Sequence, residues 1–280
     1  MIFKDKKVLI TGGTGSLGKQ LVSRILTGEQ GTPSKVVVFS RDETKQNEMR
    51  LEWKKKAVAT DEIIFRQADE VLDFQIGDVR DLKSIHGVLR NVDIVINAAA
   101  LKQVPTCEYF PFEAVRTNIE GVHNIVTAIA NNGYKVDTVV CVSTDKACKP
   151  INVMGMTKAI QERIFIQGNM RCPETRFVGV RYGNVLASRG SVIPLFINQI
   201  QNGGPVTITD TRMTRFLLSL DDAVDTIFFA IKEAERGELI IPKPLSALVE
   251  DVADVMIGNR SIDKQNIGIR PGEKIHEILI

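Results

Sequence analysis

The stretch Thr11-Gly12-Gly13-Thr14-Gly15-Ser16-Leu17-Gly18 decides the fold of this 280-residue chain. It follows the short apolar run Val8-Leu9-Ile10 and opens a helical pattern. Its glycines have the spacing of a turn that brings backbone N–H groups and a helix N-terminus against a pyrophosphate. A glycine-rich turn alone is weak evidence, but its place directly after the first strand makes it strong. The stretch predicts a dinucleotide-binding unit whose cofactor contacts are Gly12, Thr14, Gly15, Ser16, Leu17 and Gly18.

Further apolar runs follow along the chain and alternate with helical patterns. These runs are rich in β-branched residues, as strands buried on both faces are, and they are residues 8–10, 36–39, 93–96, 139–142 and 177–180. Between two of them, residues 112–131 carry apolar side chains at spacings of three and four, which predicts one amphipathic helix with an inner face of Val115, Ile119, Val122, Val126 and Ile129. Strand–helix alternation predicts an α/β protein with a Rossmann-type doubly wound parallel sheet.

The regular alternation fades after about residue 184. There Gly203-Gly204-Pro205, Ile241-Pro242-Lys243-Pro244 and Arg270-Pro271-Gly272 punctuate shorter elements. We therefore expect an NADP-binding Rossmann domain over residues 1–184. A smaller C-terminal substrate-binding lobe is expected over residues 185–280, with segments that return to the Rossmann domain.

Composition excludes several classes of protein. With 44% hydrophobic and 25% charged residues, the chain is ordinary for a soluble globular protein. A net charge of +2 gives no electrostatic reason to expect a nucleic-acid partner. No apolar stretch approaches the roughly 20 residues that would span a bilayer, and the first residues run straight into a strand, without a signal peptide. The four cysteines show no close metal-ligand pairing, so we expect reduced thiols, no metal site and a cytoplasmic location.

The end of the second strand bears on the choice of cofactor. An acidic residue directly at the strand end would favour a free ribose 2′-OH, whereas Arg41 with Ser40 suits a 2′-phosphate. NADP is therefore favoured over NAD. The alternative is an exposed Arg41 beside an Asp42 that still selects NAD.

Two later strand ends add cofactor candidates. Asp78 and Val79 precede a helix, at a place where an Asp can accept a hydrogen bond from an adenine amine. The small side chains of Ala98-Ala99-Ala100 would let a cofactor lie against the backbone, although alanines are also common packing residues.

Ser143-Thr144-Asp145-Lys146 sits at the carboxyl end of another predicted strand. In open α/β sheets ligands bind at that edge. A neighbouring Asp145 and Lys146 can serve there as an acid and a base. The alternative is a solvated pair of surface charges.

Met154 occupies the position where hydride-transferring enzymes with this frame keep an acid/base tyrosine, four residues before a lysine. Met154 and Lys158 would share one helix face, with Lys158 at the nicotinamide ribose and Met154 at the reacting carbon. Methionine has no ionisable proton, so Met154 either shapes the pocket or packs in the core, and catalysis has moved or been lost. The nearest replacement is the hydroxyl of Thr144, a far weaker acid than tyrosine, which would need a charged neighbour or a relay through Lys158.

From these motifs the chain resembles the extended short-chain dehydrogenase/reductase superfamily and, within it, the nucleotide-sugar 4,6-dehydratases that act on UDP-N-acetylglucosamine. The matching segments span nearly the whole chain in the expected order. They are residues 40–43, 100–105, 113–118, 143–147, 181–185, 188–194, 209–216 and 268–274.

The resemblance implies a reaction in three steps: a hydride leaves sugar C4 for NADP, water is eliminated across C5–C6, and the hydride returns to C6. It implies that Asp145 protonates the departing C6 hydroxyl and that Lys146 takes the C5 proton. Such proton transfers typically contribute about 10² to 10⁴-fold each. Some members with methionine at the tyrosine position are active, and their threonine before the Asp-Lys pair assists C4 oxidation, a role that the resemblance carries to Thr144.

The resemblance also implies binding residues and partners. Asn118 would contact the cofactor; the residues expected at the UDP-sugar substrate are Lys102, Asn184, Arg189, Thr209, Arg215 and Glu273. Arg215 suits a diphosphate through bidentate contacts, and Glu273 suits a ribose hydroxyl pair. A homo-oligomer without membrane insertion is expected. A nucleotide-sugar epimerase, a GDP-linked substrate and a silent nucleotide-sugar-binding protein remain as alternatives.

Overall fold

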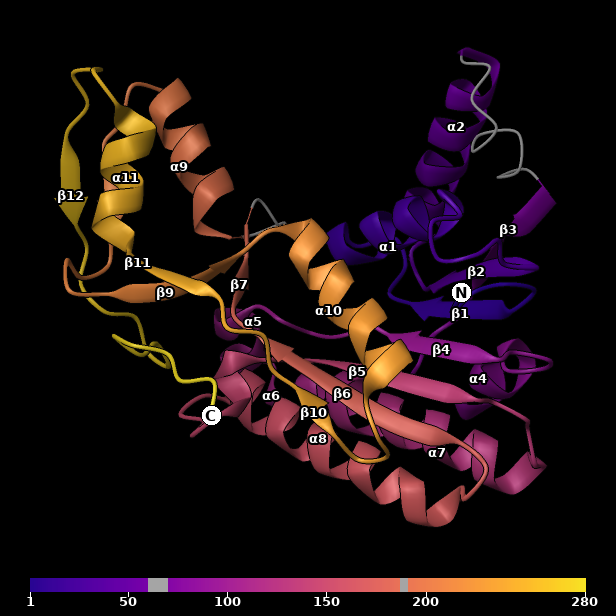
Figure 1. Cartoon of the computed structure of the whole chain (residues 1–280). Coiled ribbons are helices and arrows are strands. Elements are labelled where there is room, and N and C mark those ends of the chain that lie inside the picture. Colours follow the sequence, from indigo (N-terminus) through magenta and orange to yellow (C-terminus); the bar gives the residue numbers. More distant parts are fainter. Residues whose placement is uncertain (60–69, 187–190) are drawn as a thin grey trace.

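The centre of the molecule is a parallel sheet of seven strands in the order β10-β6-β5-β4-β1-β2-β3 (Figure 1). This computed structural model describes residues 1–59, 70–186 and 191–280. The strands are β1 (Lys7–Thr11), β2 (Lys35–Ser40), β3 (Leu72–Ile76), β4 (Ile94–Asn97), β5 (Thr138–Thr144), β6 (Arg176–Tyr182) and β10 (Leu239–Ile240). The predicted Rossmann-type doubly wound sheet is confirmed. β3 and β10, which lie outside the five apolar runs, complete its two edges.

Side chains of each strand alternate between two hydrophobic layers. From β1, Val8 and Ile10 face the layer formed with α1 (Ser16–Leu26), α2 (Glu43–Ala59) and α10 (Leu220–Glu233). Leu9 faces the opposite layer, formed with α4 (Leu82–Val88), α7 (Gly121–Asn132) and α8 (Val153–Arg171). Because both faces are covered, the strands are apolar throughout, as a parallel sheet requires.

The helix predicted over residues 112–131 is interrupted. The structure has α6 (Pro111–Ala114), the π-helical segment η1 (Val115–Glu120) and then α7. The prediction of one regular α-helix is therefore wrong over η1, where the wider turn accommodates one extra residue. As a result Asn118 is buried there, while Val115 and Ile119 are only partly buried; Val122, Val126 and Ile129 in α7 are buried as predicted.

A second, smaller body of structure lies beside the sheet (Figure 1). Its strands form two small sheets, β11-β9-β7 and β12-β8. Its own apolar cluster includes Phe196, Val206, Met213 and Val249. The elements are β7 (Asn184–Val185), α9 (Val192–Gln201), β8 (Val206–Ile208), β9 (Thr214–Leu218), β11 (Leu245–Leu248), α11 (Val249–Ile257) and β12 (Lys264–Asn266).

Part of the chain after residue 184 returns to the large sheet. α10 packs in the same apolar layer as α1, and β10 pairs in parallel with β6. The last residues run from the small lobe back across the carboxyl ends of the large sheet, where Asn152 and Arg181 donate hydrogen bonds to the carbonyls of Gly272 and Leu279. The division at residue 184 stays a prediction.

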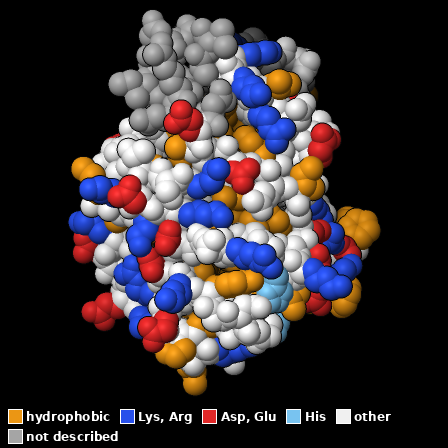
Figure 2. Space-filling model, turned by 90° about the vertical axis from the view of Figure 1, so that its right-hand side faces the viewer, with side chains coloured by type: hydrophobic (Ala, Val, Ile, Leu, Met, Phe, Trp, Pro, Cys, Tyr) orange, Lys and Arg blue, Asp and Glu red, His pale blue; other side chains and the backbone are white. Residues whose placement is uncertain are grey.

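The surface carries charges of both signs (Figure 2), as the small net charge of the chain leads one to expect. On the face shown in Figure 2, basic and acidic side chains are interspersed and hydrophobic side chains are scattered among them. Within residues 1–59, 70–186 and 191–280, none of the helices is long and apolar enough to cross a bilayer.

Candidate functional site

A cavity of about 860 Å³ lies between the carboxyl ends of the large sheet and the small lobe. Its walls come from the segments after β1, β4, β5 and β6, from α8, and from the small lobe and tail. The switch point of the sheet, between β1 and β4, opens into this cavity, which is where ligands bind in such folds. The predicted residues that line it are Gly12, Gly15, Ser16, Leu17, Gly18, Ala98, Ala99, Ala100, Lys102, Thr144, Lys146, Met154, Lys158, Asn184, Thr209, Arg215 and Glu273.

The glycine turn forms a cradle at one end of the cavity. Gly12 has φ +66°, and a Cβ there would lie 2.8 Å from the Cα of Ala99, so a side chain would collide with the next strand end. Gly15 is the N-cap of α1 and supplies no side-chain cap, so the helix N-terminus is open toward the cavity. This geometry fits a dinucleotide pyrophosphate. Thr14 is buried and does not line the cavity.

The residues predicted to select the cofactor lie outside the cavity lining. Arg41 has a side chain that is 58% exposed, and its Nη1 is 3.9 Å from Oδ2 of Asp78. Asp78 is paired with Arg80, whose Nη2 lies 2.7 Å from Oδ2. Burial opposes ionisation of Asp78, but the hydrogen bonds from Arg80 prevail and lower its pKa. Arg41 is thus the more available of these two predicted groups.

Three further residues predicted to contact the cofactor have structural roles instead. Val79 is buried in an apolar layer, and the hydroxyl of Ser40 accepts a hydrogen bond from Gln46. Asn118 is fully buried and bonds both the N–H and the carbonyl of Leu101 (2.8 and 3.0 Å) and the hydroxyl of Thr157 (3.0 Å). Asn118 therefore fixes the loop after β4 to α8 and stays away from the cavity.

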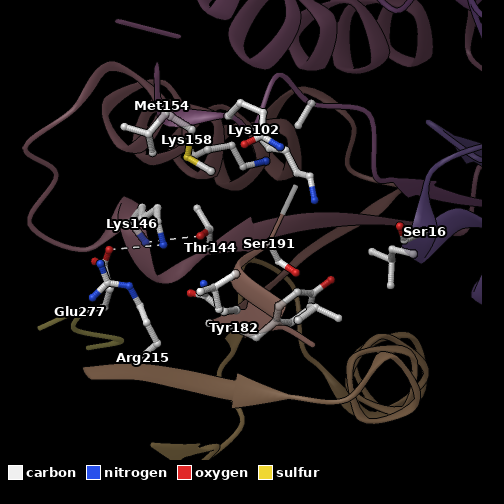
Figure 3. A pocket seen from close by; sticks show the side chains of 18 of the residues that line it. Ser16, Lys102, Thr144, Lys146, Met154, Lys158, Tyr182, Ser191, Arg215 and Glu277 are labelled. Carbon is white, nitrogen blue, oxygen red and sulfur yellow. Dashed lines mark hydrogen bonds and ion pairs between the residues drawn. The ribbon is translucent and has the colours of Figure 1, made fainter. Parts of the chain in front are cut away.

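The Thr144-Asp145-Lys146 triplet stands where β5 ends and the short 3₁₀ turn η2 (Asp145–Ala147) begins. The Thr144 hydroxyl donates to Oδ1 of Asp145 over 2.9 Å, and Lys146 Nζ lies 3.2 Å from the same oxygen. Thr144 and Lys146 line the cavity (Figure 3). The pair predicted as acid and base is therefore in direct contact, and the alternative of solvated surface charges is wrong.

Asp145 itself is fully buried and does not line the cavity. Its second oxygen, Oδ2, has no hydrogen-bond partner among the described residues. A buried carboxylate oxygen without a partner is unusual in proteins and often marks a working group. Among the residues that contact its Oδ1, Thr144 and Lys146 line the cavity.

Met154 and Lys158 share one face of α8, as predicted, and both line the cavity. Met154 is 6% exposed and also packs with Cys107 and Ala114. It therefore both shapes the cavity and packs in an apolar cluster. A Cβ at Gly155 would lie 2.2 Å from the carbonyl oxygen of Lys146, so only glycine lets α8 approach the triplet this closely.

Lys158 is buried, and its Nζ donates to the carbonyl of Val142 (2.7 Å) and to Oε1 of Gln161 (2.6 Å). Burial lowers the pKa of Lys158 and outweighs the opposing effect of the neighbouring Glu162 carboxylate. The Lys158 amine thus already donates to two other groups, whereas the Thr144 hydroxyl bonds Asp145 directly over 2.9 Å. Asp145 is therefore the more direct proton acceptor for Thr144.

Among the predicted substrate residues, Arg215 has the most distinctive surroundings. Its guanidinium donates to the carbonyls of Thr214 (2.7 Å), Ile275 (3.0 Å) and Lys274 (2.9 Å). Two of its five N–H bonds thus hold the tail, a third is taken by its own strand, and two remain for a ligand. Asn184 Oδ1 is buried without a hydrogen-bond partner among the described residues. Arg189 lies outside the described residues.

Among the cavity groups that sequence reasoning missed, Glu277 and Tyr182 have the most distinctive surroundings. Glu277 lines it and lies 3.3 Å from Lys146 Nζ, yet it belongs to the tail, and no local motif connects the two residues. Tyr182, at the end of β6, also lines the cavity; its hydroxyl is buried and has no hydrogen-bond partner in the described part of the chain. Burial raises the pKa of Tyr182, so its hydroxyl stays protonated. The four cysteines are free, and no group of three metal-ligating side chains occurs in the described residues.

The doubly wound sheet, the glycine cradle and the cavity at the carboxyl ends of the strands define an enzyme of the extended short-chain dehydrogenase/reductase class. A family model described as polysaccharide biosynthesis protein matches residues 8–280. The chain belongs to this family, whose relatives modify nucleotide sugars.

Similar proteins carry more than one activity in their names. The UDP-glucose 4-epimerase of Rickettsia conorii is 45% identical over 284 residues, which cover 100% of this chain and 79% of that protein. Pen from Bacillus thuringiensis superposes with a TM-score of 0.90 at 40% identity, covering 100% of this chain and 83% of that one. DesIV, the dTDP-glucose 4,6-dehydratase of Streptomyces venezuelae solved with NAD bound, gives 0.82 at 21% identity over 98% of this chain and 88% of that one, and it shares the fold. The chain is therefore a nucleotide-sugar enzyme whose reaction has to be argued from its site.

Proposed function

We propose that the protein is an NADP-dependent 4,6-dehydratase that converts UDP-N-acetylglucosamine to a 4-keto-6-deoxy sugar nucleotide. The observation that carries this proposal is the contact of one Asp145 oxygen with both the Thr144 hydroxyl and the Lys146 amine. Oxidation at C4 needs one proton acceptor, whereas elimination across C5–C6 needs a base and an acid together. A hydroxyl, a carboxylate and an amine in contact meet both needs.

Thr144 begins the proposed proton path. Its hydroxyl faces the cavity and donates to Asp145, so it takes the proton of the sugar C4 hydroxyl while passing its own proton to the carboxylate. Thr144 does not have to be acidic in this arrangement, because it never carries a full negative charge. A nicotinamide cofactor, when bound in the cradle, supplies the hydride exchange with the sugar.

Asp145 and Lys146 complete the elimination. Lys146 removes the C5 proton, which the new C4 ketone has acidified, and protonated Asp145 returns its proton to the departing C6 hydroxyl by way of Thr144. The C5–C6 double bond forms as the C6–O bond breaks, and water leaves. After the hydride reaches C6, Lys146 returns its proton to C5. Both residues then have their starting protonation, so the cycle closes without another reactant.

The cavity residues suit the two halves of the substrate. We assign Lys102 to the sugar, Asn184, Thr209 and the two remaining N–H bonds of Arg215 to the diphosphate and uridine, and Glu273 to a ribose. All of them line one cavity. Lys158 holds the nicotinamide ribose, and Arg41 meets the 2′-phosphate of NADP from the end of β2.

A second candidate is a 4-epimerase, because the Rickettsia relative carries that name at 45% identity. An epimerase removes and returns the C4 hydride and leaves C5 and C6 unchanged. It therefore does not need a base such as Lys146 to remove the C5 proton. The absence of an acid/base tyrosine at Met154 affects both candidates equally. The Asp145–Lys146 contact favours the dehydratase.

The deciding experiment is an NMR and mass-spectrometric time course with UDP-N-acetylglucosamine, NADP and purified protein in deuterated water. A dehydratase yields a product lighter by one water that carries deuterium at C5. A product of unchanged mass without deuterium at C5 identifies the epimerase. Binding without any turnover would leave a nucleotide-sugar-binding protein.

A further inference from the structure

We propose that Glu277, in the C-terminal tail, is a positioning residue that aims the amine of Lys146 at sugar C5. This inference rests on the dehydratase proposed above and goes beyond it, because it adds a residue outside the Rossmann frame to the elimination step. The tail thereby becomes part of the machinery that handles the C5 proton.

The geometry around Lys146 carries the inference. Nζ lies 3.3 Å from Oε1 of Glu277, which approaches it from the tail (Figure 3). It also lies 3.2 Å from Oδ1 of Asp145, its neighbour in the chain. An amine has four tetrahedral directions, one of them taken by its own carbon. With two directions held by carboxylates, only one is left, and Lys146 lines the cavity. The direction from which Lys146 can exchange a proton with the sugar is thereby confined to that remaining one.

Glu277 is buried and lies between two lysines, although its Oε2 has no hydrogen-bond partner among the described residues. Its side chain is 2% exposed, and its other oxygen, Oε2, lies 3.5 Å from Nζ of Lys274. Lys274 in turn donates to the carbonyl of Cys148 over 2.7 Å, one residue beyond the turn that carries Lys146. The positive charge of Lys274 balances the negative charge of the buried Glu277 carboxylate.

The tail around Glu277 is anchored on both sides. Before it, Arg215 binds the carbonyls of Lys274 and Ile275, and the backbone N–H of Thr214 donates to Ile275 over 3.0 Å. After it, Arg181 donates to the carbonyl of Leu279 over 2.7 Å. These contacts fix the backbone independently of the Glu277 side chain. A change confined to that side chain therefore tests its effect on Lys146 and leaves the tail in place.

The test compares Glu277→Met, which removes both carboxylate oxygens at similar length, with Glu277→Gln, which keeps one acceptor for two lysines. Single-turnover absorbance of the reduced nicotinamide reports C4 oxidation, and deuterium entry at C5 reports the step of Lys146. We expect Glu277→Met to slow C5 exchange about 10²-fold, as misplacement of a reacting group does, while the reduced cofactor still forms and then accumulates. Glu277→Gln is expected to recover part of the C5 rate.

The outcomes separate this inference from the proposed function. If the unchanged protein neither loses water nor exchanges C5, the dehydratase itself is wrong, and the inference falls with it. If the unchanged protein does both and Glu277→Met exchanges C5 at the same rate, or loses C4 oxidation to the same extent, the positioning role alone is overturned. Should Glu277→Met fail to fold, Glu277→Gln decides by the same two readouts. Glu250→Gln, which changes a carboxylate that pairs with Lys264 on the small lobe, serves as the control without effect.

Discussion

The hydroxyl of Thr144 donates a 2.9 Å hydrogen bond to Oδ1 of Asp145, and this bond joins a group in the cavity to a carboxylate that is fully buried. A proton can thus leave the substrate without any acid/base side chain at position 154. In the proposed reaction, this bond takes over the role that a tyrosine at position 154 would have. It also makes each of the two residues separately testable.

Thr144→Ala removes the hydroxyl that connects the cavity to Asp145, so C4 oxidation should slow by about 10² to 10⁴-fold. Thr144→Ser keeps a hydroxyl and should retain most of the rate. Formation of reduced nicotinamide in a single turnover measures both variants. Equal rates for Thr144→Ala and Thr144→Ser would show that the proton takes another path.

Asp145→Asn keeps the shape of the side chain but removes its ability to take a proton. We expect kcat to fall by about 10² to 10⁴-fold while UDP-sugar binding changes little, because the side chain does not line the cavity. Turnover and calorimetric binding measure the two effects, with the unfolding midpoint as a check on the fold. An active Asp145→Asn variant would assign the acid role to a different residue.

Met154 should matter for packing and little for chemistry. Met154→Leu conserves volume and should lower the free energy of unfolding by less than about 1.5 kcal/mol, whereas Met154→Ala should lower it by about 2–5 kcal/mol. Urea unfolding and turnover measure these effects, and turnover per folded molecule should stay close to that of the unchanged protein. Relocation of the proton path to Thr144 would be refuted if Met154→Tyr strongly raised the rate of C4 oxidation.

Arg41 should determine the preference for NADP. A charge-assisted hydrogen bond contributes about 1.5–3 kcal/mol, so Arg41→Ala should weaken NADP binding by about 10 to 150-fold and leave NAD binding nearly unchanged. Fluorescence titration with both nucleotides measures the ratio. Lys54→Ala, on the exposed side of α2, is the control. A parallel loss for both cofactors would place Arg41 at the shared part of the dinucleotide.

Lys158 should make stability depend on pH. Because burial lowers its pKa in the folded protein, the unfolded chain, with a pKa of about 10.4, binds one more proton in the window between the lowered value and about 10.4. The free energy of unfolding should therefore rise with pH in that window, by up to about 1.36 kcal/mol per pH unit from this group. Lys158→Met should remove this contribution, as urea unfolding at several alkaline pH values will measure. Lys135→Met, at an exposed site, is the control. If Lys158→Met and this control leave the slope of the unfolding free energy against pH equally unchanged, Lys158 keeps its ordinary proton affinity.

The fold was predictable because its signals are local. The Gly12 to Gly18 turn and the buried strands are each contained within about ten consecutive residues, and each signal is specific to a parallel sheet. The cavity lining was largely predictable for the same reason: ligands meet strand ends, and the strand ends were identified. The sequence placed the Thr144-Asp145-Lys146 triplet at the edge where ligands bind. It did not show that Asp145 is fully buried behind the cavity wall.

The remaining features depend on contacts between distant segments. Nothing in the sequence connects Glu277 to Lys146, because their contact arises only when the tail returns to the sheet. Arg80 forms an ion pair with Asp78, two residues earlier in the chain. The sequence alone does not show whether two opposite charges at this spacing will pair. Apolar spacing indicates a helical face, but it does not distinguish the turns of η1 from those of an ordinary α-helix, so the burial of Asn118 was missed.

The extra residue in η1 has a consequence for how this chain can change over evolutionary time. Removing one residue between Val115 and Glu120 would restore a regular helix and rotate the preceding part by about 100° relative to α7. Asn118 would then turn away from Leu101 and Thr157, two residues that it joins from separate segments. We expect descendants of this chain to keep the length of that segment more strictly than its composition. A deletion there should survive only together with a replacement at position 157 and a new partner for the backbone of Leu101.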